Sequence, residues 1–302
     1  MQSAIQVSDL VVNYRQKNGQ QVEAVKGLSF YVGAGEIVGF LGPNGAGKSS
    51  TLKALMGFVK LAAGSCQVFG IESWTEEARK RIGYLPEVAM YYPFLNPKET
   101  LTLYGELQGL GGSRLKSEVD HLLEVVGLKD ATHKLNKNLS KGMLQRVGIA
   151  QSLLGNPELL ILDEVTSGLD PVGRKELRTL LKSKQQNGTT LFFSSHELAE
   201  VDLLCDRLLF IHKGKLIQEK RISDLHGELS KYEIVFTSKT TINLDGAAIL
   251  NHIDGSLIAN FESKPAFLAG IETINQKGGQ ILDLTSTPGS LEDYFIQQVE
   301  AA

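Results

Sequence analysis

The chain has 302 residues, of which 42% are hydrophobic and 22% charged, and its formal net charge is −3 at pH 7. This composition predicts one large packed domain or two modest ones and excludes a generally disordered chain. The slightly acidic balance gives no reason to expect a nucleic-acid partner, because such partners select basic surfaces. Two cysteines, Cys66 and Cys205, are too few for a disulfide framework or a metal cluster and are typical of a reducing compartment.

The N-terminus carries no predicted secretory signal. Its first residues, MQSAIQVSDL, lack a basic region followed by an apolar core. Apolar runs such as LLIL at 159–162 are far too short to cross a bilayer. We therefore expect a soluble, cytoplasmic chain that can still lie against a membrane protein.

A glycine-rich segment, GFLGPNGAGKSS at 39–50, separates a predicted strand from a predicted helix. The preceding EIVGFL (36–41) is a short apolar run typical of a strand, and Leu52, Leu55 and Met56 then recur at helical spacing. Glycines let backbone N–H groups approach an anion closely, and the N-terminus of a helix adds a positive dipole end. Strand, loop and helix together predict a loop that binds the phosphates of a nucleoside triphosphate.

The side chains at the end of this loop favour the same ligand. Lys48 is placed to reach the β- and γ-phosphates, and the hydroxyl of Ser49 is suited to holding Mg²⁺. The loop residues expected to contact the nucleotide are Gly42, Pro43, Asn44, Gly45, Ala46, Gly47, Lys48, Ser49 and Ser50.

A second landmark is LLILDE at 159–164. Its four apolar residues predict a strand buried on both faces of a parallel sheet, so that Asp163 emerges at the carboxyl end, where ligands bind in this class. Asp163 is placed to hold Mg²⁺, and Glu164 to polarise the attacking water. The alternative is a core strand that ends in a solvated acidic pair.

A GTPase is the first alternative to consider. DPVG at 170–173 matches the loose Asp-x-x-Gly pattern of that class. The guanine-binding Asn-Lys-x-Asp segment does not follow, because NKN at 136–138 lacks the aspartate. The sequence therefore does not favour a GTPase.

The segment LSKGMLQRVGIAQSLLGNP at 139–157 predicts a further helix. Its apolar residues at spacings of four, three and four are Met143, Val147, Ala150 and Leu154. Ser140 and Gly142 lie at the helix N-terminus, which could face a phosphate. An ordinary capped core helix explains the same pattern, and the residues alone leave both readings open.

Five ordered motifs make the chain resemble the ATP-binding subunit of an ABC transporter over residues 4–222. The motifs are the phosphate loop, LSKGM, LLILDE, SGLD (167–170) and SSHEL (194–198). The resemblance implies an α/β P-loop NTPase core of the ABC type, with an antiparallel β-subdomain and a helical subdomain at about 95–150. It also implies a homodimer that sandwiches two ATP, each held by the phosphate loop of one subunit and the LSKGM signature loop of the other.

The resemblance assigns roles residue by residue. Across the dimer, Ser140 and Gly142 would contact the γ-phosphate, and Asp170 would bridge to the partner's phosphate loop. Within one subunit, His196 would sense the γ-phosphate, while Glu164 would be the base that positions water.

Adenine recognition is expected from an aromatic residue in LVVNY. Tyr14 lies 28 residues before Gly42 and matches the aromatic that stacks on adenine in the family. A tyrosine that faces the core is the alternative at this position. The expected catalytic set is then completed by Lys48 beside Glu164 and His196.

Some positions depart from the family pattern. Lys141 and Met143 stand where the signature usually has Gly and Gln, and Val165 follows Glu164 where Pro is more common. Glu87, in GYLPE, replaces the Gln that links Mg²⁺ to the transmembrane partner, and a carboxylate can still bind the metal. The catalytic aspartate, glutamate, lysine and histidine are all present, so we expect activity.

The remaining segments predict how the chain is organised. MYYPFLNP at 90–97 is either a docking surface or a rigid packed loop. After about 225, KYEIVFTS, PAFLAGIETINQKGG and QILDLTST predict a strand, a helix and a strand, and hence a small α+β domain. We expect an ATP-binding domain at 1–224 and an accessory domain at 225–302. LEDYF near the C-terminus resembles the tail of ABC-2 exporter ATPases, which favours export.

The expected function is an ATPase that couples ATP-driven dimer closure to transport by a separate integral-membrane permease, at the cytoplasmic face of the inner membrane. A soluble ABC-type ATPase acting on ribosomes or DNA is the alternative. It is disfavoured by the acidic balance and by the presence of one phosphate loop without a second cassette. A scaffold that binds nucleotide without turnover is disfavoured by Glu164 and His196.

Overall fold

The computed structural model describes residues 3–16, 19–195, 197–229, 231–238, 240–251, 256–287 and 291–300. The chain divides into two compact units, Met1–Glu219 and Lys220–Ala302. In the part of the chain that the structure describes, no helix is both long and apolar enough to cross a membrane.

The first unit is a mixture of strands and helices. Its strands are β1 (Ser3–Arg15), β2 (Gln21–Gly33), β3 (Ile37–Leu41), β4 (Ala63–Val68), β5 (Ile71–Glu72), β6 (Ile82–Leu85), β7 (Leu159–Asp163), β8 (Thr190–Ser195), β9 (Arg207–His212) and β10 (Lys215–Arg221), the last of which runs into the second unit. Its helices are α1 (Lys48–Leu55), α2 (Glu76–Lys80), α3 (Pro97–Leu107), α4 (Gly112–Val125), α5 (Lys141–Ser152), α6 (Pro171–Gln186) and α7 (Leu198–Leu204), with 3₁₀ turns at Lys129–Ala131 and Asn136–Asn138.

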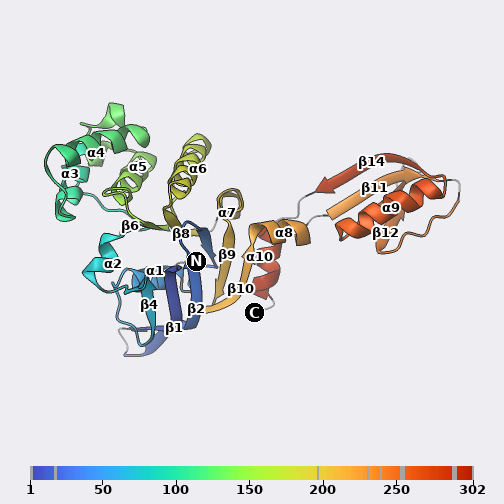
Figure 1. The fold of residues 1–302 in the computed structure, drawn as a ribbon, viewed down its shortest axis with the longest axis horizontal. Helices are drawn as coiled ribbons and strands as arrows, with labels where there is room; N and C mark the ends of the chain where they lie inside the picture. Colours follow the sequence, from blue (N-terminus) through green and yellow to red (C-terminus); the bar gives the residue numbers. More distant parts are fainter. Residues whose placement is uncertain are drawn as a thin grey trace. The chain divides into compact units, whose positions relative to one another are not determined.

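A six-stranded sheet in the order β10-β9-β3-β8-β7-β6 forms the centre of this unit (Figure 1). The pairs β9–β3, β3–β8, β8–β7 and β7–β6 are parallel. Every residue of β3, β7 and β8 is buried, as expected of strands covered on both faces. The strands predicted at 36–41 and 159–162 are therefore observed, and their carboxyl ends lie at the same edge of the sheet.

A second, antiparallel sheet in the order β2-β1-β4-β5 is the expected β-subdomain. Helix α1 contacts β1, β2 and β4 of the antiparallel sheet and β7 of the parallel sheet. The rings of Phe30 on β2, Phe40 on β3 and Phe192 on β8 lie 5.3–5.9 Å apart between centroids. This apolar core fixes α1, and with it the loop that precedes α1.

Helices α3, α4 and α5 pack against one another and form the expected helical subdomain (Figure 1). Helix α3 begins with a capping box between Asn96 and Glu99, and Pro97 occupies its first turn. The residues of α4 predicted to share a face are all buried: Leu115, Val119, Leu122 and Leu123.

Two glycines let α5 approach β6 closely. A Cβ at Gly83 of β6 would lie 1.8 Å from the carbonyl oxygen of Ser152, and a Cβ at Gly148 of α5 would lie 2.5 Å from Leu85 Cδ1. The helix that follows the signature loop is therefore held directly against the sheet.

Gly83→Ala is expected to lower the free energy of unfolding by about 1–3 kcal/mol, because the added methyl group forces α5 away from β6. The measurement is urea unfolding followed by circular dichroism. Gly111→Ala is the matched control, since a Cβ there meets nothing within 4 Å. Equal midpoints for the two variants would contradict the close packing.

The second unit is a small α+β domain, as expected. Its elements are α8 (Ile222–Leu229), β11 (Lys231–Thr237), β12 (Ala247–Asn251), β13 (Leu257–Phe261), α9 (Lys264–Gln276), β14 (Gln280–Thr287) and α10 (Leu291–Glu300). The sheet has the order β12-β13-β11-β14 with antiparallel pairs. Its core includes Tyr232, Ile234 and Phe236 of β11, which alternate as predicted, and Ile274 of α9.

Candidate active site

A pocket of about 640 Å³ opens at the carboxyl edge of the parallel sheet. Such a volume is typical of sites for small ligands. The pocket is lined by Tyr14, Ala24, Pro43, Asn44, Gly45, Ala46, Gly47, Lys48, Ser49, Ser50, Glu87, Asp163 and Glu164. The structure thus brings the glycine-rich loop, the acidic pair, Glu87 and Tyr14 to one place, although they are far apart in the sequence.

The loop conformation requires glycine at defined positions. Gly45 and Gly47 have φ values of 79° and 110°, in the left-handed region that favours glycine. A Cβ at Gly42 would lie 2.3 Å from the carbonyl oxygen of Ile211, and one at Gly47 would lie 2.6 Å from that of Ala24. The loop backbone is therefore packed closely from behind, and Gly47 caps the N-terminus of α1.

The turn between β9 and β10 supports the loop from this side. The N–H of Gly214 donates to the Ala46 carbonyl at 2.8 Å, and the Gly214 carbonyl accepts from the N–H of Lys26 at 2.9 Å. Sequence reasoning missed this support, although a Lys213–Gly214 pair after an apolar strand is typical of a turn. The turn holds the loop in place before any ligand arrives.

Lys48 is buried, and its ammonium group donates to the carbonyl oxygen of Gly42 at 2.5 Å. Burial lowers the pKa of Lys48, while the negative charges of Glu164, Asp163 and Glu87 act in the opposite direction and raise it. The lysine thus lies in the field of the three carboxylates that line the same pocket. An ammonium held in this way is suited to binding an anion that enters between them.

Asp163 and Glu164 are both buried at the end of β7. The Ser194 hydroxyl donates to Asp163 Oδ1, and the N–H of Glu164 donates to the Ser194 carbonyl at 3.2 Å. Glu164 has a φ of 51°, which a residue with a side chain rarely adopts and which occurs preferentially at functional sites. Sequence reasoning found both carboxylates but had no signal for this backbone conformation.

Ser49, Glu87 and Asp163 provide one hydroxyl and two carboxylates around the same pocket. Hard oxygen donors of this kind are the ligands that Mg²⁺ prefers, with water and phosphate oxygens completing the octahedron. The donor set therefore fits the metal that the phosphate loop implies.

Ser140, Gly142 and Asp170 are not among the described residues that line this pocket. Ser140 caps α5 and accepts from the N–H of Met143 at 3.2 Å, and Asp170 caps α6 and accepts from the N–H of Gly173 at 2.9 Å. A Cβ at Gly142 would lie 2.8 Å from the Gly168 carbonyl oxygen. The signature loop and the SGLD loop therefore touch one another, away from the pocket of the same chain.

The unusual signature residue Lys141 joins these two loops. Its ammonium group donates to the Ser167 hydroxyl at 3.1 Å, and its aliphatic stem covers Gly168. Gln145, on the same helix, donates to the Val165 carbonyl at 2.9 Å, directly after the acidic pair. Sequence reasoning missed the contact of Gln145, because the two residues belong to different motifs.

His196 lies outside the described residues. The segment after Glu87 lies within the described residues. Val88, Met90, Tyr92 and Phe94 expose their side chains, while the amide of Asn136 donates to the Tyr92 carbonyl at 3.0 Å. The loop therefore has a fixed backbone and an exposed apolar surface.

Comparisons with known proteins agree with this geometry. A family model described as ABC transporter matches residues 25–167. The bacitracin transport ATP-binding protein BcrA of Bacillus licheniformis is 36% identical over 310 residues, which cover 99% of this chain and 98% of the relative. The linearmycin resistance ATP-binding protein LnrL of Bacillus subtilis is 35% identical over 245 residues, which cover 80% and 79%.

Solved structures show the same fold. An ATP-binding subunit of an ABC transporter superposes with a TM-score of 0.67 at 28% identity, covering 74% of this chain and 92% of the other. The ATP-binding cassette MJ0796, solved as a dimer with ADP and phosphate, superposes with a TM-score of 0.67 at 22% identity, covering 72% and 98%. The chain therefore belongs to the ATP-binding proteins of ABC transporters.

Proposed function

We propose that this chain binds and hydrolyses ATP with Mg²⁺ and couples the reaction to transport by a separate membrane permease. The observation that carries the proposal is the single pocket in which the phosphate loop, Lys48 and the pair Asp163–Glu164 meet. Binding of the phosphates and activation of water require these groups within one pocket.

Nucleotide binding is assigned to the loop and to Tyr14. The N–H groups of residues 44–49 and the N-terminus of α1 hold the phosphate oxygens, and the Lys48 ammonium exchanges the Gly42 carbonyl for the β- and γ-phosphates. The partly exposed ring of Tyr14 stacks on adenine at the mouth of the pocket. Ser50 and Ala46 complete the loop wall.

Glu164 is assigned the role of the base. Its carboxylate orients the attacking water and accepts its proton, and Lys48 and His196 stabilise the charge on the γ-phosphate. Ser49, Glu87 and Asp163 would hold Mg²⁺, which when bound neutralises charge on the β- and γ-phosphates.

The site is completed by a second copy of the chain. Ser140, Gly142 and Asp170 lie on loops away from the chain's own pocket, so they remain available for the γ-phosphate and the phosphate loop of a partner. A two-fold axis places both sets in register, which gives a homodimer with two equivalent sites. Residues 1–224 form this ATPase domain in the proposal, and 225–302 an accessory domain.

The permease is proposed to dock on the exposed apolar segment Val88–Phe94, beside Glu87. Several exposed apolar side chains within one short segment favour an interaction surface. The relatives named for bacitracin transport and linearmycin resistance, together with the LEDYF tail, support export. The chain would then act at the cytoplasmic face of the cell membrane, without a nucleic-acid partner.

The test uses tagged Glu164→Gln protein, trapped with ATP in detergent-solubilised cells and analysed by mass spectrometry after affinity capture. A polytopic membrane protein recovered in near-equal amount is the expected result. Recovery of ribosomal or DNA-repair proteins without a membrane protein would contradict the transport role and favour the soluble ATPase.

A further inference from the structure

Arg174, on the first turn of α6, joins two segments that carry different parts of the proposed mechanism. Its Nε donates to the Leu169 carbonyl at 3.2 Å, and its Nη1 forms an ion pair with Glu197 Oε2 at 2.6 Å. Leu169 immediately precedes Asp170, and Glu197 immediately follows His196. One side chain therefore joins the SGLD loop to the histidine segment, residues 195–197.

Both ends of this bridge are held firmly. Asp170 caps α6 through the N–H of Gly173 and accepts from the N–H of Arg174 through its own carbonyl, each at 2.9 Å. The N–H of Glu197 donates to the hydroxyl of Ser195, the last residue of β8, at 2.9 Å. One guanidinium group therefore ties the Leu169 carbonyl to the Glu197 carboxylate and limits how far the two segments can separate.

We propose that Arg174 is a positioning residue that makes the SGLD loop and the histidine segment move as one body. This inference rests on the proposed function, in which Asp170 contacts the partner's phosphate loop and His196 contacts the γ-phosphate of its own site. Arrival of the γ-phosphate in one site is then communicated to the other site through Arg174. Loss of the bridge slows turnover without weakening the first binding of ATP, because Arg174 does not line the nucleotide pocket.

The same two helices contain an internal control. Arg178, one turn further along α6, forms an ion pair with Glu200 of α7. The side chains of that pair are 22% and 11% exposed, against 32% and 22% for Arg174 and Glu197. If the Arg174–Glu197 pair did no more than hold α6 near α7, removing the more buried Arg178–Glu200 pair would lower kcat at least as much.

The experiment compares Arg174→Ala and Arg178→Ala in the full-length chain. The ATP dissociation constant is measured by calorimetry, kcat by phosphate release, and the unfolding midpoint by circular dichroism. We expect kcat of Arg174→Ala to fall about tenfold or more, because a small misplacement of reacting groups is enough to slow the reaction by this factor. The ATP dissociation constant should stay within about twofold of the wild-type value. Arg178→Ala is expected to lower the unfolding midpoint more and to keep kcat within about twofold.

Further variants keep the test decisive if Arg174→Ala folds poorly. Arg174→Lys retains the charge but cannot make both contacts, so its kcat should lie between those of wild type and Arg174→Ala. Glu197→Gln should lower kcat as well, and the double variant Arg174→Ala/Glu197→Gln should fall no further than the worse single variant.

The results distinguish failure of the proposed ATPase function from failure of the role assigned to Arg174. A wild-type chain that hydrolyses no ATP would overturn the proposed function together with this inference. An active wild type overturns the inference alone if Arg174→Ala keeps its kcat within about twofold, or if Arg178→Ala loses as much activity as Arg174→Ala.

Discussion

Glu164→Gln is expected to lower kcat for ATP hydrolysis by a factor on the order of 10²–10⁴, the usual contribution of a positioned general base. The amide has the shape of the carboxylate but cannot accept a proton from the attacking water. ATP binding should be retained, because Lys48 and the backbone of the phosphate loop are unchanged. The measurements are phosphate release under saturating ATP and calorimetric titration with ATP.

Glu158→Gln is the matched control for this substitution. Glu158 immediately precedes β7, whereas Glu164 follows that strand at its other end. The Glu158 side chain forms an ion pair with Arg81 at the surface. Its replacement should leave kcat within about twofold of wild type. If Glu164→Gln retained more than about a tenth of the wild-type kcat, Glu164 could not be the general base.

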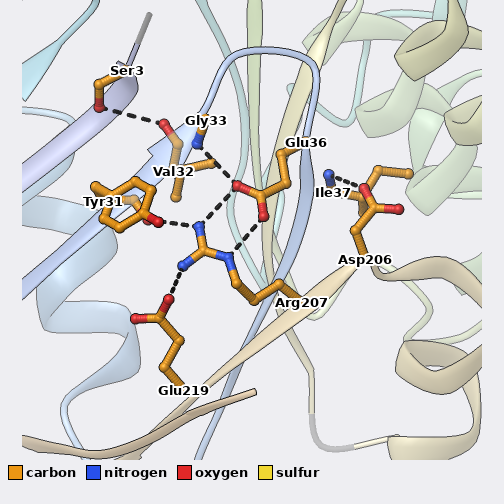
Figure 2. Close-up of polar contacts among 9 residues, drawn as sticks. All are labelled: Ser3, Tyr31, Val32, Gly33, Glu36, Ile37, Asp206, Arg207 and Glu219. Atoms are coloured by element: carbon orange, nitrogen blue, oxygen red, sulfur yellow. Dashed lines mark hydrogen bonds and ion pairs between the residues drawn. The ribbon is translucent and has the colours of Figure 1, made fainter. Parts of the chain in front are cut away.

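The second large effect is on stability and concerns Arg207 of β9. Figure 2 shows its guanidinium group between two carboxylates: Nε and Nη2 bind Glu36 at 2.7 and 2.8 Å, and Nη1 binds Glu219 at 2.5 Å. Nη2 also donates to the Tyr31 carbonyl at 2.8 Å, and the group lies 4.8 Å from the centre of the Tyr31 ring. The cluster links β2, β9 and β10 at the edge of the central sheet.

Arg207→Ala is expected to lower the free energy of unfolding by about 3–5 kcal/mol, because Arg207 is only 5% exposed and its removal deletes the buried ion pairs with Glu36 and Glu219. Burial alone would lower the pKa of Arg207, but Glu36 and Glu219 raise it overall, so the cation persists at every pH at which the fold is tested. Chemical unfolding of the two proteins measures the difference.

The exposed ion pair between Lys129 and Glu124 gives the control for this prediction. Both side chains are well exposed, and such pairs contribute little to stability because water screens them. Lys129→Ala should therefore leave the unfolding curve unchanged within error. A loss below about 1 kcal/mol for Arg207→Ala would show that the cluster of Figure 2 does not anchor the sheet edge.

The sequence predicted those parts of the site whose residues are close together in the chain. The strand before the glycine-rich loop, the loop itself and the helix after it are contiguous, so spacing alone located them at 36–56. The buried strand of LLILDE was predicted for the same reason, because an uninterrupted apolar run that ends in acidic residues is typical of a parallel strand. That Tyr14 belongs to the site followed from family resemblance rather than from any local pattern.

The contacts that the sequence could not predict join residues far apart in the chain. Glu36 and Arg207 are separated by 171 positions, and neither carries a motif. Arg174 lies in α6 and Glu197 just before α7, and charged residues at such positions are usually solvated, so only the fold brings them together. In the second unit, β12 and β13 were not predicted, because each is only five residues long and shows no clear alternation of apolar and polar residues.

The central claim is that two chains close on ATP, and the mass of the Glu164→Gln protein tests it most directly. One chain has a mass of 32.9 kDa. Multi-angle light scattering in Mg²⁺ with ATP should give about twice that mass, because Ser140, Gly142 and Asp170 of each copy complete the site of the other, while ADP should return the protein to the mass of one chain. A mass that remained at 32.9 kDa in saturating ATP, with nucleotide bound, would contradict the shared site.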